Sequence, residues 1–529
     1  MSDTVTTVNP TTGKTLETYN VLSGKALEDA VQRCHNAFLD WRLTSVEDRA
    51  NIIKAIGAAL RDRKDELAEL MTKEMGKLLK QSHQEIDLCA AICDYSAAEA
   101  PAAFAPEERE IEGGEKGHIF YSPIGVVYGI QPWNFPAYQV VRYSIASLIA
   151  GNGVLLKHAS NVTGSGQMLQ EIYEAAGLPK GLFQALVISH DQSDTLISHD
   201  LVRGVTLTGS DGAGRKVGAK AAEAVKKTVL ELGSNDAYIV LEDADIDAAV
   251  QTCVTGRTYN NGETCIAAKR FIVVDAIYDQ FRDAYVAAMK RVTPGDPMGE
   301  DADIGPMARK DLRDDLHQQV KDSLEGGAKL LCGGEMPETD GFFYPATVLE
   351  NVAPGQPAYD DELFGPVAAL IRAQDADDAM RIANDSRFGL GGGILERSQD
   401  LAGPELISWV DDNDDIRAVR SEQVQEVLAK LCGDEVSAKT LRTWNGSHAA
   451  FAAALDAPTL TITAMAEAAA ERLHNTPTIA RNSYIHPQII GLADLPDRQR
   501  VAQLSALPQR QVSGLRLGEG RLIDFLNAN

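Results

Sequence analysis

The sequence predicts an α/β protein with parallel sheets, followed by a mainly α C-terminal fragment. Short apolar runs alternate with helical stretches from about residue 126 to residue 274. Such runs are typical of strands buried on both faces, and their alternation with helices indicates βαβ units. At 529 residues the chain exceeds what one core usually organises, so at least two domains are expected. Beyond about residue 398 the alternation stops.

The elements of the α/β part can be followed in order. Residues 45–80 are expected to be helical, because Ser45 and Asp48 can form a capping box and apolar residues then recur at helical spacing. Residues 109–121 are polar around a Gly-Gly pair, which predicts a hairpin. The predicted strands occupy residues 126–130, 154–156, 205–207, 238–241 and 271–274.

Later segments are marked by turns and composition. Residues 294–311 are rich in turn formers, and Gly389–Gly393 is expected to be a hinge or loop. Residues 411–415 are predicted to form a polar turn. Helices are expected at 421–431 and 460–473.

Charge and cysteine content limit the classes of function. A net charge of -26 argues against general affinity for nucleic acid, which depends on Lys and Arg. The seven cysteines contain no CxxC pair, which favours reduced thiols and a cytoplasmic protein. No secretory signal or membrane-spanning run is visible, and no metal site is predicted.

Two residues are candidates for covalent chemistry. Cys265 follows an Asn261-Gly262 turn and precedes a predicted strand, where a thiol can be partly exposed and reactive. A lone cysteine is more often a buried apolar residue. Glu231 ends an apolar run, and in an apolar pocket it could take a proton from water or from the thiol. The plainer alternative is a solvated carboxylate.

Three further features suit the same chemistry. The amide of Asn134, just after a strand, can donate to a developing oxyanion, although it could simply be fixed in its proline-rich turn. Lys157 lies at a strand end, where ligands collect in open α/β sheets. The Gly-rich turn at residues 208–214 opens a helix and suits a pyrophosphate, though it is not a GxGxxG motif.

Together these pieces resemble the aldehyde dehydrogenase superfamily from about residue 8 to about residue 397. Within it the chain is most similar to the succinate-semialdehyde dehydrogenase group, to which Glu74-Met-Gly-Lys77 also corresponds. The other matching motifs occupy residues 132–136, 155–160, 208–214, 230–235, 261–270, 295–299 and 362–366.

The resemblance implies a division of the chain into three parts. Residues 1–231 would form a Rossmann-type NAD(P)-binding domain, with the hairpin near 109–121 used in oligomerisation. Residues 232–397 would form a truncated α/β catalytic domain that carries the thiol. Residues 398–529 would be the mainly α fragment.

The resemblance also implies roles for single residues. Cys265 would attack a small-molecule aldehyde, Asn134 would stabilise the oxyanion, and Glu231 would activate the water that hydrolyses the thioester. NAD-selective members often carry a Glu where this chain has Ser160, so the cofactor is expected to be NAD(P), with NADP slightly favoured. The residues assigned to cofactor binding are Trp133, Lys157, Ser160, Gly209, Ser210, Gly214, Glu362 and Phe364.

After about Arg397 the family pattern is lost. The Asn- and Gly-rich active-site segment and the final interface strand of complete members are not found, so any homo-oligomer would lack that strand. From about residue 399 the tail resembles a fragment of bacterial type IB DNA topoisomerases. By that resemblance Tyr484 would be a nucleophile toward DNA, with Arg442 and Asn475 at the phosphate.

Three interpretations therefore stay open. The preferred one is an NAD(P)-dependent aldehyde dehydrogenase with an unrelated extension. The second is a topoisomerase-type protein that binds and cleaves DNA through Tyr484. The third is a fusion in which neither activity is intact.

Overall fold

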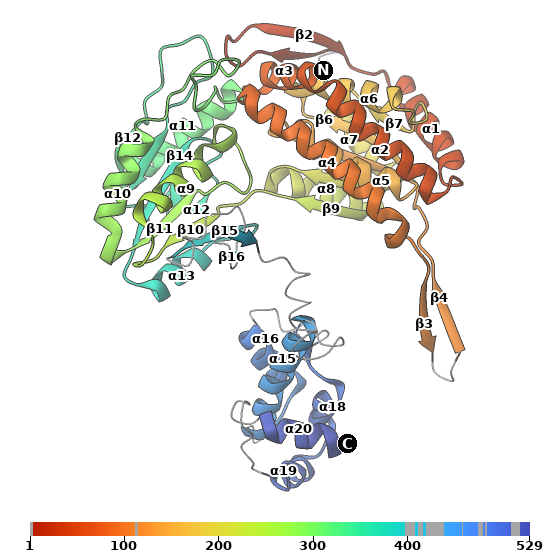
Figure 1. Cartoon of the computed structure of the whole chain (residues 1–529), viewed down its shortest axis with the longest axis vertical. Coiled ribbons are helices and arrows are strands. Elements are labelled where there is room, and N and C mark those ends of the chain that lie inside the picture. Colours follow the sequence, from red (N-terminus) through yellow and green to blue (C-terminus); the bar gives the residue numbers. More distant parts are fainter. Residues whose placement is uncertain are drawn as a thin grey trace. The chain divides into compact units, whose positions relative to one another are not determined.

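The computed structural model describes residues 4–111, 115–396, 408–410, 416–418, 438–456, 459–473, 480–481, 484–508 and 519–528. The chain forms two compact units, Met1–Asp400 and Leu401–Asn529 (Figure 1). The first unit holds two large sheets, one in each of its two halves. Among the described residues, no helix is long and apolar enough to cross a membrane.

The first sheet has five parallel strands in the order β7-β6-β5-β8-β9. The predicted strands at 126–130, 154–156 and 205–207 are confirmed as its three central strands. Apolar side chains on both faces of these strands pack against helices, which is why they could be recognised from apolar runs. The strands are β5 (Val126–Gln131), β6 (Gly153–His158), β7 (Phe183–Ala185), β8 (Val202–Thr208) and β9 (Lys227–Glu231).

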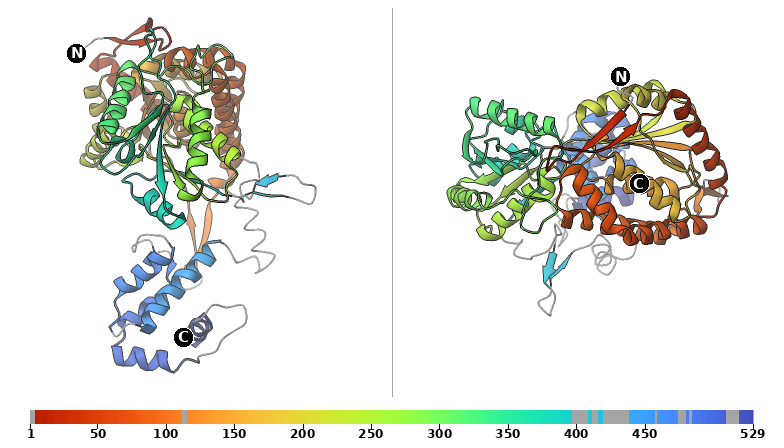
Figure 2. Two further views of the ribbon diagram at one scale, coloured as in Figure 1. Left: turned by 90° about the vertical axis from the view of Figure 1, so that its left-hand side faces the viewer. Right: turned by 90° about the horizontal axis from the view of Figure 1, so that it is seen from above.

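Helices cover both faces of this sheet, as Figure 2 shows from two further directions. They are α1 (Gly24–Trp41), α2 (Val46–Asp62), α3 (Lys64–Met75), α4 (Leu79–Ala103), α5 (Tyr138–Ile149), η1 (Ser160–Val162), α6 (Thr163–Ala175), α7 (His190–Ser198) and α8 (Asp211–Glu223). The predicted helical stretch 45–80 is thus confirmed as α2 and α3. Ser45 caps α2 by accepting the Asp48 N–H at 3.0 Å. Gly76 ends α3 with a left-handed φ of 86°.

Two hairpins extend from the first half. The predicted hairpin at 109–121 is present as β3 (Glu107–Ile111) paired antiparallel with β4 (Glu115–Ile119). Its role in oligomerisation stays a prediction. The second hairpin, β1 (Thr4–Val8) with β2 (Thr15–Asn20), was not predicted, because its residues are mostly polar and exposed.

The second sheet has six strands in the order β12-β13-β14-β11-β10-β15, and only β12 runs antiparallel to its neighbour. The predicted strands at 238–241 and 271–274 are confirmed. The strands are β10 (Ala237–Val240), β11 (Arg270–Val274), β12 (Lys329–Cys332), β13 (Thr347–Glu350), β14 (Val367–Ala373) and β15 (Gly392–Leu395). Their helices are α9 (Ile246–Thr258), η2 (Tyr259–Gly262), α10 (Asp275–Met289), α11 (Lys310–Glu325), α12 (Pro357–Asp360) and α13 (Ala376–Asn384).

The prediction of a hinge or loop at Gly389–Gly393 is partly wrong. Its last two glycines begin β15, where Gly392 pairs with Ala237 and Gly393 pairs with Tyr238. A Cβ atom on Gly393 would lie 3.3 Å from the Tyr238 ring, so glycine here allows a close approach within a sheet.

The second unit has its own apolar core, formed by residues that include Phe451, Met465, Leu504 and Phe525. Helix 460–473 is confirmed as α16, and the described part of the unit is mainly helical. The predicted helix at 421–431 and the predicted turn at 411–415 lie outside the described residues. The elements are β16 (Ser408–Val410), β17 (Ile416–Ala418), α15 (Ala438–Asp456), α16 (Ile462–Leu473), α18 (Pro487–Ile490), η4 (Gly491–Asp494), α19 (Asp497–Ser505) and α20 (Glu519–Ala528).

Candidate active site

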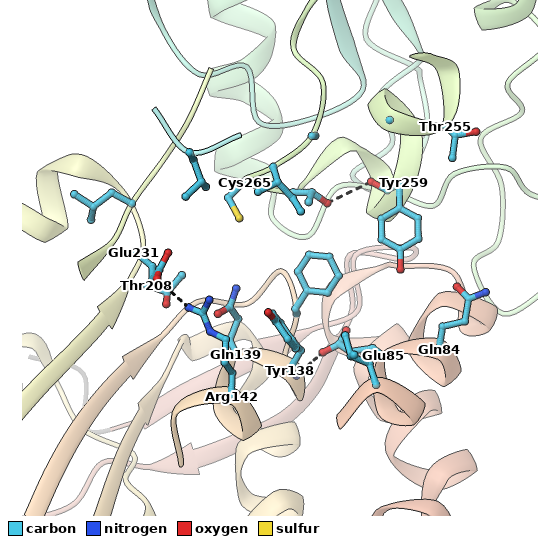
Figure 3. A pocket seen from close by; sticks show the side chains of 18 residues that line it. Gln84, Glu85, Tyr138, Gln139, Arg142, Thr208, Glu231, Thr255, Tyr259 and Cys265 are labelled. Carbon is cyan, nitrogen blue, oxygen red and sulfur yellow. Dashed lines mark hydrogen bonds and ion pairs between the residues drawn. The ribbon is translucent and has the colours of Figure 1, made fainter. Parts of the chain in front are cut away.

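A cavity of about 530 Å³ lies between the two halves of the first unit. Figure 3 shows the Cys265 sulfur directed into it, with Glu231 and Arg142 at one side. Cys265 comes from the loop before β11, Glu231 from the end of β9 and Arg142 from α5. The structure therefore brings together a thiol and a carboxylate that are far apart in the sequence.

The loop that carries Cys265 is fixed by a tight turn. Asn260 and Asn261 have left-handed φ angles of 54° and 59°, and Gly262 follows with φ 75°. The Asn261 side chain donates to the carbonyls of Gly76 and Pro306 at 3.0 and 2.9 Å. The predicted turn is confirmed, and its asparagine side chains tie it to the first half of the unit.

Cys265 is half-buried, and this burial raises the pKa of its thiol. The positive charge of Lys269 and the Ile266 N–H act in the opposite direction, whereas the negative charges of Glu362 and Asp236 raise the pKa further. Nearby positive and negative charges thus shift the pKa of the thiol in opposite directions.

Asn134 is buried beside this loop, at 4% exposure. Its Nδ2 donates to the Glu263 carbonyl at 3.1 Å, and its own carbonyl accepts from Asn260 Nδ2 at 3.0 Å. Asn134 and Cys265 both line a second cavity of about 240 Å³. An amide that carries two N–H groups therefore lines the same cavity as the thiol.

Glu231 lines the 530 Å³ cavity beside apolar side chains such as Phe135 and Ile266, but its carboxylate is not buried there. Its side chain is 37% exposed, and one carboxylate oxygen lies 3.8 Å from the Arg142 guanidinium. The physical reason is that β9 is an edge strand, with Lys227 to Leu230 all exposed. A carboxylate at the open end of such a strand keeps access to water.

Sequence reasoning missed Arg142. It is the one cationic side chain among the described residues that line the 530 Å³ cavity. The signal was its position on α5, which begins directly after the Asn134 turn, but the sequence did not show which helix face meets the cavity.

The second cavity also gathers several residues that were assigned to cofactor binding. Glu362 is half-buried there, accepts the Ser234 N–H at 3.1 Å and forms an ion pair with Lys269 at 3.1 Å. The rings of Trp133 and Phe364 meet edge to face at 5.7 Å. The lining consists of Pro132, Trp133, Asn134, Thr208, Gly209, Ser210, Leu232, Gly233, Cys265, Leu312, Glu362 and Phe364.

A third, smaller cavity lies at the end of β6 and is lined by Lys157 and Ser160, among others. Burial lowers the pKa of Lys157. Gly214 is not in this cavity or the second; it lines a neighbouring cavity with Arg387.

These cavities fit an extended dinucleotide. They lie around the carboxyl ends of the parallel strands β5, β6 and β8, where open α/β sheets bind ligands. Ser210 caps α8, so the helix N-terminus and its backbone N–H groups are placed beside the second cavity. A Cβ on Gly233 would lie 2.4 Å from Glu362 Oε2, so glycine is needed for that carboxylate to occupy its position.

The turn that carries Asn134 is anchored from two sides. Glu85 accepts the N–H groups of Ala137 and Tyr138 at 2.8 and 2.9 Å, and it forms a fully buried ion pair with Lys77. On the other side, His158 Nε2 lies 3.0 Å from the Pro136 carbonyl while its Nδ1 accepts the Ala159 N–H. Burial lowers the pKa of His158 to about 4, so the ring is neutral at pH 7, and its Nδ1 also lies 3.2 Å from the Gln131 carbonyl.

We expect Lys77→Met to destabilise the protein by about 3 kcal/mol, because it leaves the buried Glu85 carboxylate without its cation. Lys73→Met is the matched control, since Lys73 pairs with Glu69 on the surface and should cost less than about 0.5 kcal/mol. Denaturant unfolding measures both. Equal losses of unfolding free energy in the two variants would show that the buried ion pair stabilises the protein no more than the surface pair does.

The residues of the alternative DNA chemistry lie in the second unit. Tyr484 is partly exposed, and its carbonyl accepts from Ser447 Oγ at 3.4 Å. Arg442 lies in α15, but its side chain, like all of Asn475, is outside the described residues.

Comparison with known proteins covers the first unit. The family model described as "Aldehyde dehydrogenase family" matches residues 1–403. A succinate semialdehyde dehydrogenase [NAD(P)+] of Escherichia coli K12 is 43% identical over 395 residues, which are 75% of this chain and 85% of that protein. A succinate-semialdehyde dehydrogenase [NADP(+)] of Mycobacterium tuberculosis H37Rv is 42% identical over 397 residues, covering 75% and 87%.

Solved structures of related proteins match a similar share of the chain. The succinic semialdehyde dehydrogenase of Streptococcus pyogenes in complex with NADP+ matches with a TM-score of 0.73 and 36% identity, covering 75% of this chain and 87% of that one. The predicted α/β fold of residues 8–397 is confirmed. None of these findings supports the topoisomerase or fusion interpretations of residues 398–529, which stay predictions.

Proposed function

Because the chain belongs to the aldehyde dehydrogenase family, we propose that it oxidises succinate semialdehyde to succinate with NADP. The observation that carries this proposal is the shared cavity of Cys265, Glu231 and Arg142, which supplies a nucleophile, a base and a cation for the substrate's far carboxylate. The names of the relatives support the same substrate and cofactor.

The chain's own residues carry the chemistry as follows. The Cys265 thiolate attacks the aldehyde carbon, and the new S–C bond leaves a negative oxygen. The second N–H of the Asn134 amide, together with the backbone N–H at Cys265, stabilises that oxygen. NADP, when bound, supplies the acceptor for the hydride that leaves this carbon, and the cysteine is then held as a thioester.

Hydrolysis of the thioester regenerates the enzyme. Glu231 takes a proton from water, the hydroxide attacks the thioester carbon, and the S–C bond breaks with the electron pair returning to Cys265. The half-exposed position of Glu231 supports this role, because the base must meet water at the cavity mouth. Glu362 would hold the ribose beside the thiol, and Lys157 and Ser160 the ribose at the other end.

The role of Arg142 can be tested by substrate choice. We expect Arg142→Leu to lower kcat/KM for succinate semialdehyde about 10- to 100-fold, which corresponds to losing a hydrogen bond to a charged group. With butanal, which has no carboxylate, the change should stay within about threefold. Arg309→Leu is the control, since Arg309 has a similar exposure of 41% but lies outside the cavity. Equal losses on both aldehydes would show that Arg142 does not recognise the carboxylate.

The choice of cofactor can be tested at Ser160. We expect Ser160→Glu to lower the preference for NADP over NAD at least about tenfold, because a carboxylate beside Lys157 would repel a 2′-phosphate. Ser160→Gln has the same length without the charge and should leave most of the preference in place. The measurement is kcat/KM for each cofactor; an unchanged ratio in Ser160→Glu would place the 2′-phosphate elsewhere.

A further inference from the structure

Lys269 is a buried cation beside the thiol that the mechanism above does not use. It directly precedes β11, and its side chain is 1% exposed. Its backbone is fixed within the second sheet, because its N–H donates to the Asp236 carbonyl at 3.1 Å and its carbonyl accepts from Ala369 at 3.0 Å. The backbone that carries the ammonium group is therefore held in place.

The ammonium group contacts the thiol loop and the proposed cofactor anchor at the same time. Its Nζ donates to the Cys265 carbonyl at 2.6 Å and lies 3.1 Å from Glu362 Oε1. Weaker contacts at 3.3 Å reach the Thr264 carbonyl and Ser234 Oγ. Burying an ammonium group is costly unless it is paired and hydrogen-bonded, and here acceptors surround it.

We propose that Lys269 is a positioning residue that joins the Cys265 loop to Glu362 and favours the thiolate form of Cys265 by its charge. This inference rests on the proposed function only in taking Cys265 as the reacting thiol. A lysine that merely filled space would fix the loop but would not alter how readily the thiol loses its proton.

The charges that face Lys269 come from three other elements of the unit. Glu362 follows α12, Asp236 precedes β10 and Arg257 lies on α9. Burial and Arg257 lower the pKa of Lys269, whereas Glu362 and Asp236 raise it. The same two carboxylates raise the pKa of Cys265, and Lys269 is the charged side chain that lowers it. Removing Lys269 and removing the charge of Glu362 should therefore act on the thiol in opposite directions.

The test is the pH dependence of alkylation of Cys265 by iodoacetamide, in the full-length chain without aldehyde or cofactor. Mass spectrometry of the Cys265 peptide follows that thiol among the other cysteines. We expect Lys269→Met to raise the midpoint of the pH profile of Cys265 alkylation by about one pH unit. Alkylation below that midpoint should then slow about tenfold. Glu362→Gln, which keeps Lys269 in place, should lower the midpoint.

Lys77→Met tests whether the midpoint also shifts when the unit is merely made less stable. It also removes a buried, ion-paired lysine from this unit, but Lys77 does not act on the Cys265 thiol, so the midpoint should not move. An unchanged midpoint in Lys269→Met would overturn the proposal, and so would shifts of the same sign in Lys269→Met and Glu362→Gln. If Lys269→Met does not fold, a midpoint in Glu362→Gln that fails to fall overturns it alone. Alkylation needs no turnover, so the result is independent of whether the chain oxidises succinate semialdehyde.

Discussion

Replacing Cys265 by alanine is expected to reduce aldehyde oxidation by at least about 10⁴-fold, because the reaction then has no nucleophile to hold the acyl group. Binding of NADP should persist, since Lys157, Ser160 and Glu362 are untouched. Steady-state formation of NADPH and a fluorescence titration with the cofactor measure the two effects.

Cys332→Ala is the matched control for this loss. Cys332 is also a half-buried free thiol, but it lies on β12, away from the cavity. We expect it to keep the wild-type rate. A Cys265→Ala protein that still turns over at a rate near wild type would show that another group forms the covalent intermediate.

Replacing Glu231 by glutamine is expected to separate the two halves of the reaction. Formation of the thioester should remain fast, giving a burst of about one NADPH per active site, whereas hydrolysis should slow about 10²- to 10⁴-fold without its general base. Stopped-flow absorbance resolves the burst from the steady state, and intact-mass measurement should find the acyl group on the protein.

A carboxylate elsewhere provides the comparison for Glu231. Glu171 pairs with Arg63 at 3.4 Å on the surface, as Glu231 pairs with Arg142, so Glu171→Gln removes a similar contact far from the thiol. It should show the wild-type steady state. If Glu231→Gln loses the burst together with the steady-state rate, Glu231 acts before the thioester forms.

The sequence was most informative where one physical signal dominated. Strands β5, β6, β8 and β11 are buried along most of their length and β10 is buried or half-buried, so their apolar runs marked them. The turn before Cys265 was marked by Asn-Gly, and the structure places it within a left-handed backbone segment. These two signals were enough to predict the fold class and to place the thiol.

Properties that depend on contacts distant in sequence could not be predicted in the same way. The exposure of Glu231 follows from the position of β9 at a sheet edge, and strand order cannot be seen in an apolar run. Arg142 and Lys269 have their significance only through which cavity or carboxylate they face. Gly392 and Gly393 look like a loop until Ala237 and Tyr238 of β10 are placed beside them.

The measurement that tests the central claim most directly is formation of NADPH by the purified full-length chain with succinate semialdehyde, compared with Cys265→Ala. We predict one NADPH for each succinate formed, at a rate that vanishes in the variant, and a slower rate with NAD. No rate above that of the variant, from folded protein that binds NADP, would contradict the claim that this chain is an active succinate-semialdehyde dehydrogenase.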